Sequence, residues 1–197
     1  MIKSIPNLIT LGNLACGLLG ITMVSQGDPF YAFLFMIAGA VLDFFDGFFA
    51  RLLKADGELG KQLDSLADVV TFGVLPGLIW RFYMEAQGFC SATGFCINAY
   101  IWLLIPLGAA YRLATFNIDT RQTDSFIGLP TPANAIFILS LPLILKNSDS
   151  LVLLEMLTNQ WILLLVSIIS TVILNAEIPL FALKIKKFNL KDNSLQL

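Results

Sequence analysis

The sequence contains no histidine. Histidine is the commonest general base and the commonest ligand of transition metals in proteins, so neither role can be filled by it here. Any acid–base or metal chemistry in this chain must therefore rest on carboxylates. The basic residues are few and form no long run, which argues against nucleic-acid binding.

Cysteine is also scarce, and its three positions are Cys16, Cys90 and Cys96. No two of them have C-x-x-C spacing, so neither a zinc site nor a thioredoxin-like motif is indicated. Cys16 lies in an apolar run and is expected in the core. Cys90 and Cys96 share one predicted loop and could form a disulfide if that loop faces an oxidising compartment. The sequence leaves this pairing open.

Charged residues make up only 13% of the chain, whereas 57% of the residues are hydrophobic and the mean hydropathy is +0.79. Soluble domains carry about 25% charged residues. A membrane-spanning helix needs about 20 mostly apolar residues. We find six such runs, at residues 5–24, 30–53, 63–84, 97–116, 129–145 and 151–174. They predict an all-α, polytopic membrane helical bundle of about six transmembrane helices.

We assign residues 1–183 to a single membrane domain. Residues 184–197 are polar and are expected to form a cytoplasmic tail at the membrane surface. Residues 1–4 lead straight into the first span, which has no A-x-A site, so we expect no cleavable signal peptide.

The positions of lysine and arginine predict the orientation. If the N-terminus is cytoplasmic, ten of the twelve basic residues fall on that side and only Arg81 and Lys146 on the other. The sequence thus predicts a multi-pass cell-membrane protein with both termini in the cytoplasm.

Four aspartates lie where a membrane helix should not have them. Asp43 and Asp46 belong to the second span, and Asp64 and Asp68 to the start of the third. Spacings of three and four residues place each pair on one helix face. Because the loop between the two spans is short, the helices should be antiparallel neighbours. All four carboxylates can then converge at the cytoplasmic end.

Such a cluster predicts a site for a hard cation. Ionisable side chains inside a membrane are costly and usually face a polar cavity or bind something. Oxygen ligands without histidine or cysteine suit Mg²⁺, Mn²⁺ or Ca²⁺, and two such ions would balance four carboxylates. The small residues Gly47 and Ala50 leave room on the same helix for a ligand. A single aspartate near a helix end is usually a cap, but four with small residues between them argue against a purely structural role.

These residues form a known pattern, Asp43-x2-Asp46-Gly47-x2-Ala50-Arg51-x8-Gly60-x3-Asp64-x3-Asp68. The pattern resembles the signature of the CDP-alcohol phosphatidyltransferases at all eight fixed positions. The six predicted spans are also similar to the core of that family. The resemblance therefore extends over nearly the whole chain.

The resemblance implies a role for each residue of the signature. Asp43, Asp46 and Asp64 would be metal ligands, and Asp68 would lie at the metals and act as the general base on the acceptor hydroxyl. The site for CDP-diacylglycerol would include Gly47, Ala50, Arg51 and Gly60, together with Asn7 and Thr10 from the N-terminal stretch. The resemblance also implies a homodimer.

Within the family, other stretches are similar to the phosphatidylserine synthases of bacteria and archaea. They are NLITLGNLACGLLG from residue 7, DVVTFGVLPG from residue 68, YRLATFN from residue 111 and FIGLPTPA from residue 126. Asn134 departs from this pattern, because a small residue would be expected there.

Two arginines on the aspartates' side of the membrane are compatible with L-serine as the acceptor. A guanidinium is the preferred partner of a carboxylate, so Arg112 and Arg121 could bind that of serine. They could equally follow the positive-inside rule or bind lipid phosphate.

The expected reaction is attack of the serine hydroxyl on the lipid-side phosphorus of CDP-diacylglycerol, which gives phosphatidylserine and CMP. Direct attack is favoured because no histidine or activated serine or cysteine is evident for a covalent intermediate. The same chemistry could use glycerol 3-phosphate, inositol phosphate or choline as the acceptor. A cation transporter or a purely structural membrane protein are more distant alternatives. A transporter should have acidic residues along several spans, whereas the middles of these spans hold few.

Overall fold

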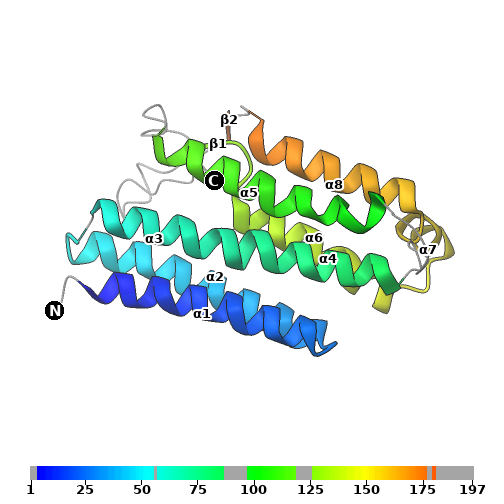
Figure 1. The fold of residues 1–197 in the computed structure, drawn as a ribbon, viewed down its shortest axis with the longest axis horizontal. Helices are drawn as coiled ribbons and strands as arrows, with labels where there is room; N and C mark the ends of the chain where they lie inside the picture. Colours follow the sequence, from blue (N-terminus) through cyan, green and yellow to red (C-terminus); the bar gives the residue numbers. More distant parts are fainter. Residues whose placement is uncertain (1–3, 56, 87–96, 119–125, 177–178, 181–197) are drawn as a thin grey trace, which may run out of the picture.

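The computed structural model describes residues 4–55, 57–86, 97–118, 126–176 and 179–180. Within these ranges the chain is a bundle of helices that run side by side along one axis (Figure 1). The helices are α1 (Ile5–Ser25), α2 (Pro29–Leu52), α3 (Glu58–Asp68), the π-helical segment η2 (Val69–Val74), α4 (Leu75–Ala86), the 3-10 helix η3 (Ile97–Leu103), α5 (Leu104–Ile118), α6 (Thr131–Asn147), α7 (Leu151–Leu157) and α8 (Gln160–Asn175). Two short strands, β1 (Phe126–Ile127) and β2 (Pro179–Leu180), pair antiparallel.

Turn and capping residues set the helix boundaries. Pro6 and Pro29 lie in the first turns of α1 and α2, where a missing backbone N–H costs nothing. Between these helices Gly27 adopts a φ of +79°, a conformation that glycine reaches without strain. Asn159 caps α8 by accepting a hydrogen bond from the backbone N–H of Trp161 at 2.9 Å. α1 and α2 therefore begin and end within one residue of their predicted positions.

The third predicted span is longer than expected, because α3, η2 and α4 form one continuous helix over Glu58–Ala86. Asp64 and Asp68 consequently lie well inside this helix and not at its start. The π-helical segment η2 begins directly after Asp68. Insertions of this kind are rare and occur frequently at functional sites.

Among the described residues, four helical segments are long and apolar enough to cross a membrane, namely α1, α2, Glu58–Ala86 and Tyr100–Ile118. They indicate a multi-pass membrane protein and confirm the expectation of an all-helical membrane bundle. α6 coincides with the fifth predicted span but is a shorter apolar helix. The number of six spans stays a prediction.

The sixth predicted span is not continuous. α7 and α8 meet at an angle of 69°, so together they form a broken span or a re-entrant segment. The break falls at Thr158 and Asn159, where Thr158 ends α7 and the side chain of Asn159 starts α8. These side chains bond to nearby backbone and compete with a continuous helix. The apolar composition of residues 151–174 concealed the break.

Two parts of the bundle are packed differently. In the first, α1 meets α2 and η2 through small or polar residues. α1 buries Pro6, Thr10, Asn13, Gly17 and Gly20, spaced alternately four and three apart. We call the contact among Asn13, Gly17, Gly39 and Thr71 the glycine-packed region. A Cβ atom added to Gly17 would lie 2.5 Å from Oγ1 of Thr71, so only glycine permits this approach.

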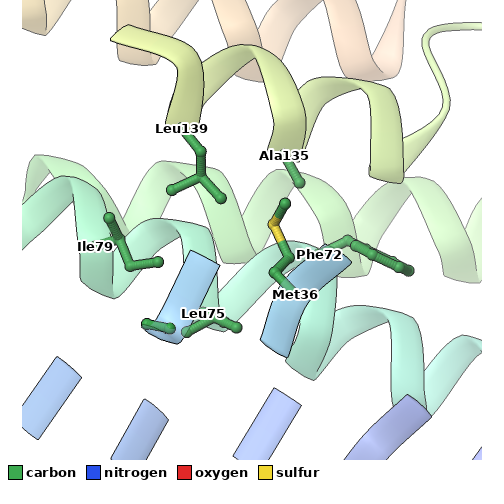
Figure 2. Packing of buried hydrophobic residues seen from close by; sticks show 7 residues of the cluster. Met36, Phe72, Leu75, Ile79, Ala135 and Leu139 are labelled. Carbon is green, nitrogen blue, oxygen red and sulfur yellow. The ribbon is translucent and has the colours of Figure 1, made fainter. Parts of the chain in front are cut away.

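The second part is filled by large side chains. An aromatic core joins α4, α5, α6 and α8, and its members are Trp80, Tyr83, Met84, Ile105, Ile138 and Leu163. A further buried hydrophobic cluster joins Met36 of α2 and Phe72 of η2 to side chains of α4 and α6 (Figure 2). Cys16, expected in the core, is a half-buried free thiol on α1.

Candidate active site

Three of the four aspartates meet at one end of the bundle. The end of α2 and the start of α3 lie together there, beside the N-terminus of α1 (Figure 1). One carboxylate oxygen each of Asp43, Asp64 and Asp68 lies within 4.8 Å of the other two. Asp68 is buried, with 7% of its surface exposed, and the other two are half-buried. This oxygen-only arrangement could hold a divalent cation.

Asp46, the fourth aspartate, is not part of this group of three. Its Oδ2 accepts a hydrogen bond from Oγ1 of Thr10 at 2.6 Å, and its side chain is buried. The sequence predicted that all four carboxylates converge; three form the group described above, and Asp46, bonded to α1, lines the same cavity as Asp64. Thr10, predicted to contact the nucleotide, is thus also a positioning residue for Asp46.

A cavity of about 460 Å³ lies beside the aspartates, between α1, the end of α2 and the start of α3. The predicted nucleotide-binding residues on its wall are Asn7, Thr10, Gly47, Ala50 and Gly60, and Asp46 and Asp64 also line it. No atom outside its own neighbourhood lies within 4 Å of a Cβ added to Gly47, so this glycine leaves open space in the cavity wall.

Arg51 differs from the other residues of the signature. It is exposed on the last turn of α2 and is not among the residues that line the cavity. Lys61 and Glu58 on α3 do line it, and the sequence reasoning assigned neither a role. Nζ of Lys61 donates a 2.7 Å hydrogen bond to the backbone carbonyl of Asn117 on α5. This bond joins the cavity wall to the helix that carries Arg112.

Arg112 is buried in α5, with 9% of its surface exposed. Its Nη2 donates a long hydrogen bond, 3.5 Å, to the carbonyl of Gly128, and its Nε has no partner among the described residues. The charge of Asp68 acts on this guanidinium. The structure therefore places one predicted acceptor residue near the aspartates. Arg121, Cys90, Cys96 and the 184–197 tail lie outside the described residues.

Sequence reasoning missed Asn13. Its Nδ2 donates a 3.3 Å hydrogen bond to Oδ1 of Asp68. A signal for it was present, because Asn13 lies three residues after Thr10 in a mostly apolar helix. Two polar residues at that spacing share one helix face.

Comparison with known proteins agrees with this geometry. The family model described as CDP-alcohol phosphatidyltransferase matches residues 3–173. This chain belongs to that family. The recognition made from the aspartate signature is therefore confirmed.

Curated relatives within the family carry more specific names. A CDP-diacylglycerol–serine O-phosphatidyltransferase of Bacillus subtilis is 40% identical over 128 residues, which are 65% of this chain and 69% of the relative. The enzyme of the same name from Helicobacter pylori strain J99 is 38% identical over 68% of this chain. An archaetidylserine synthase of Methanothermobacter thermautotrophicus is 34% identical over 70% of this chain. The matches cover 54% and 57% of the latter two relatives, so this chain spans little more than half their length.

Proposed function

We propose that this protein transfers the phosphatidyl group of CDP-diacylglycerol to L-serine and releases phosphatidylserine and CMP. The observation that carries the proposal is the meeting of three carboxylates beside a cavity lined by residues of the family signature. The names of the relatives from Bacillus and Helicobacter support serine as the acceptor. A cation pathway is not favoured, because the aspartates gather at one end of the bundle and the chain belongs to a transferase family.

The carboxylates fit Mg²⁺ or Mn²⁺, and Ca²⁺ has the same oxygen preference. Asp43, Asp64 and Asp68 offer three oxygens close enough to share an ion. Asp46, on the cavity wall, would contribute to a second ion. When bound, the cations neutralise charge on the diphosphate and on the departing CMP.

The remaining chemistry belongs to the side chains. Asn7, Gly47, Ala50 and Gly60 would border the CDP moiety in the cavity, and Arg51 would act at its outer edge. Asp68 accepts the proton of the serine hydroxyl as the serine oxygen attacks the lipid-side phosphorus. The bond from this phosphorus to the bridging oxygen breaks, and that oxygen leaves with CMP.

The acceptor site would lie between Asp68 and Arg112. Arg112 is buried, the charge of Asp68 acts on its guanidinium, and its Nε has no partner among the described residues, so this guanidinium is the candidate for binding the serine carboxylate. Gly128, whose carbonyl accepts the hydrogen bond of Arg112, has a φ of +80°. A Cβ at this position would be 2.9 Å from the carbonyl oxygen of Leu174. Only glycine therefore fits this closely packed position. Arg121 is retained as a second candidate for the serine site.

We further propose that residues 1–183 form one catalytic domain in the cell membrane, with both termini cytoplasmic, and that the protein is a homodimer. The distribution of basic residues supports the orientation. In a variant whose three native cysteines are replaced by serine, a cysteine introduced at Lys54 should react with an impermeant thiol reagent only in inside-out vesicles. Reaction of this variant in right-side-out vesicles would contradict the orientation.

An acceptor panel tests the proposed function. Purified protein is supplied with CDP-diacylglycerol, Mn²⁺ and one alcohol at a time, and CMP release is measured. We expect serine to give the highest rate and phosphatidylserine to appear as the product. A higher rate with glycerol 3-phosphate, inositol phosphate or choline would overturn serine as the acceptor but would retain the chemistry.

A further inference from the structure

Asn13 is an unusual residue in an apolar helix, because its side chain is fully buried on α1. A buried amide costs free energy unless its polar atoms are hydrogen-bonded. Its Nδ2 bonds Oδ1 of Asp68, but its own Oδ1 has no partner in the part of the chain that the structure describes. Among the described residues, the side chain of Asn13 thus makes one hydrogen bond, and its partner is Asp68, the residue to which we assign proton transfer.

The main chain of Asn13 makes a second contact with the same segment. Oγ1 of Thr71, a buried residue of η2, donates a 3.1 Å hydrogen bond to the carbonyl oxygen of Asn13. One residue of α1 is therefore bonded to two positions, Asp68 and Thr71, on either side of the α3–η2 junction. Two bonds three residues apart restrain rotation of this helix about its axis.

Close packing against α2 further restricts the side chains of Asn13 and Thr71. A Cβ added to Gly39 of α2 would lie 2.9 Å from Oδ1 of Asn13 and 2.7 Å from Cγ2 of Thr71. The amide of Asn13 and the side chain of Thr71 are thus packed against the backbone of α2. A larger residue in place of Gly39 would clash with these two side chains.

We propose that Asn13 and Thr71 form a clamp that orients the Asp68 carboxylate within the acidic group. Both are positioning residues, because they act through Asp68. The clamp deepens the function proposed above and rests on it for the catalytic role of Asp68. It requires no particular acceptor, because its bonds are made within the protein.

Three variants test the clamp. Asn13→Ala removes the amide, Thr71→Val removes the hydroxyl at nearly constant volume, and Thr71→Ser retains it. We measure kcat, the KM for CDP-diacylglycerol at saturating Mn²⁺, Mn²⁺ affinity by electron paramagnetic resonance, and the thermal midpoint of unfolding. Asn13→Ala and Thr71→Val should each lower kcat or Mn²⁺ affinity by about 10- to 100-fold, as loss of groups that orient metal ligands commonly does. The KM for CDP-diacylglycerol should stay within about threefold. Thr71→Ser should resemble the wild type.

Asn134→Ala is the matched control. Asn134 is also buried, with 1% exposed, and it also has one side-chain hydrogen bond, accepted from Ser170 of α8 at 2.6 Å. Its Nδ2 also lacks a partner among the described residues. This variant should lower the unfolding midpoint and leave Mn²⁺ affinity unchanged.

The clamp is refuted if Asn13→Ala and Thr71→Val change only the unfolding midpoint, or if Thr71→Ser is impaired as much as Thr71→Val. Should Asn13→Ala not fold, the two Thr71 variants decide. If the wild type binds Mn²⁺ but releases no CMP with serine, the proposed function fails. In that case the clamp is tested by the Mn²⁺ affinity of the three variants alone.

Discussion

The glycine-packed region and the aromatic core solve the problem of helix packing in different ways. Gly17 and Gly39 let three helices approach so closely that Asn13 and Thr71 bond across them. In the aromatic core, Trp80 instead fills the space and stacks on Tyr83 at a centroid distance of 5.4 Å. Small residues bring backbones together and fix polar groups, whereas large side chains contribute contact area. Chemistry is therefore expected in the first region and stability in the second.

The largest effect is expected when one carboxylate is removed from the acidic group of Asp43, Asp64 and Asp68. Asp64→Asn should lower kcat by roughly 10²- to 10³-fold, because a carboxylate that would hold a cation at the diphosphate is lost. The unfolding midpoint should not fall, since the substitution also relieves repulsion among the aspartates. CMP release and thermal unfolding in detergent measure the two effects.

Glu85→Gln is the control for that variant. Glu85 lies on α4 and forms an exposed ion pair with Arg81 at 2.8 Å. Exposed pairs contribute about 0–1 kcal/mol, so activity and stability should both persist. An Asp64→Asn protein that retains most of its activity would end the assignment of chemistry to the acidic group.

Arg112→Ala should have the next largest effect, and it should be specific for the acceptor. Loss of a charged hydrogen bond to the serine carboxylate should raise the KM for serine by about 10- to 100-fold. The KM for CDP-diacylglycerol should change little. Arg112→Lys should recover only part of the loss, because an ammonium cannot make a bidentate contact. Equal weakening of both substrates in steady-state kinetics would instead make Arg112 a scaffold or a lipid-phosphate ligand.

Gly17→Ala tests whether close approach itself is required. The added Cβ would meet Oγ1 of Thr71 at 2.5 Å and its Cα at 3.1 Å, so η2 must move. Overpacking of this kind costs about 1–3 kcal/mol of stability, and kcat should fall with it. Gly12→Ala on the same helix meets only Cδ1 of Leu42, at 3.3 Å, and should be tolerated. Equal behaviour of the two variants in thermal unfolding and CMP release would contradict the role of the glycine.

Trp80→Phe should have the smallest effect on turnover. Nε1 of Trp80 donates a 2.9 Å hydrogen bond to Oγ of Ser167. Its loss, with the smaller ring, should cost about 1–3 kcal/mol of stability. The kcat of the folded protein should equal that of the wild type. A drop in kcat without a loss of stability would show that the aromatic core takes part in the chemistry.

The sequence predicted the helices and most of the site because both depend on local spacing. The position of Asp43 on α2 followed from residue intervals along that helix, whereas the place of Gly60 in the cavity wall was implied by the family resemblance. The hydrogen bond that Asp46 accepts from Thr10 could not be predicted, since Thr10 lies 36 residues earlier in the chain. The role of Asn13 was hidden for the same reason, because its partners lie 55 and 58 residues away.

The break between α7 and α8 escaped prediction for a different reason. Residues 151–174 are apolar throughout most of their length, and hydropathy averages over the two residues that interrupt them. Thr158 and Asn159 bond to local backbone, which the average does not register. The π-helical segment after Asp68 was equally invisible, because its residues are ordinary for an apolar helix.

Serine-dependent CMP release after treatment with EDTA tests the central claim most directly. We predict that chelation abolishes release and that Mn²⁺ or Mg²⁺ in excess of the chelator restores it, because the acidic group would have no cation to hold. Full activity in EDTA would contradict the account of Asp43, Asp64 and Asp68 as a metal site.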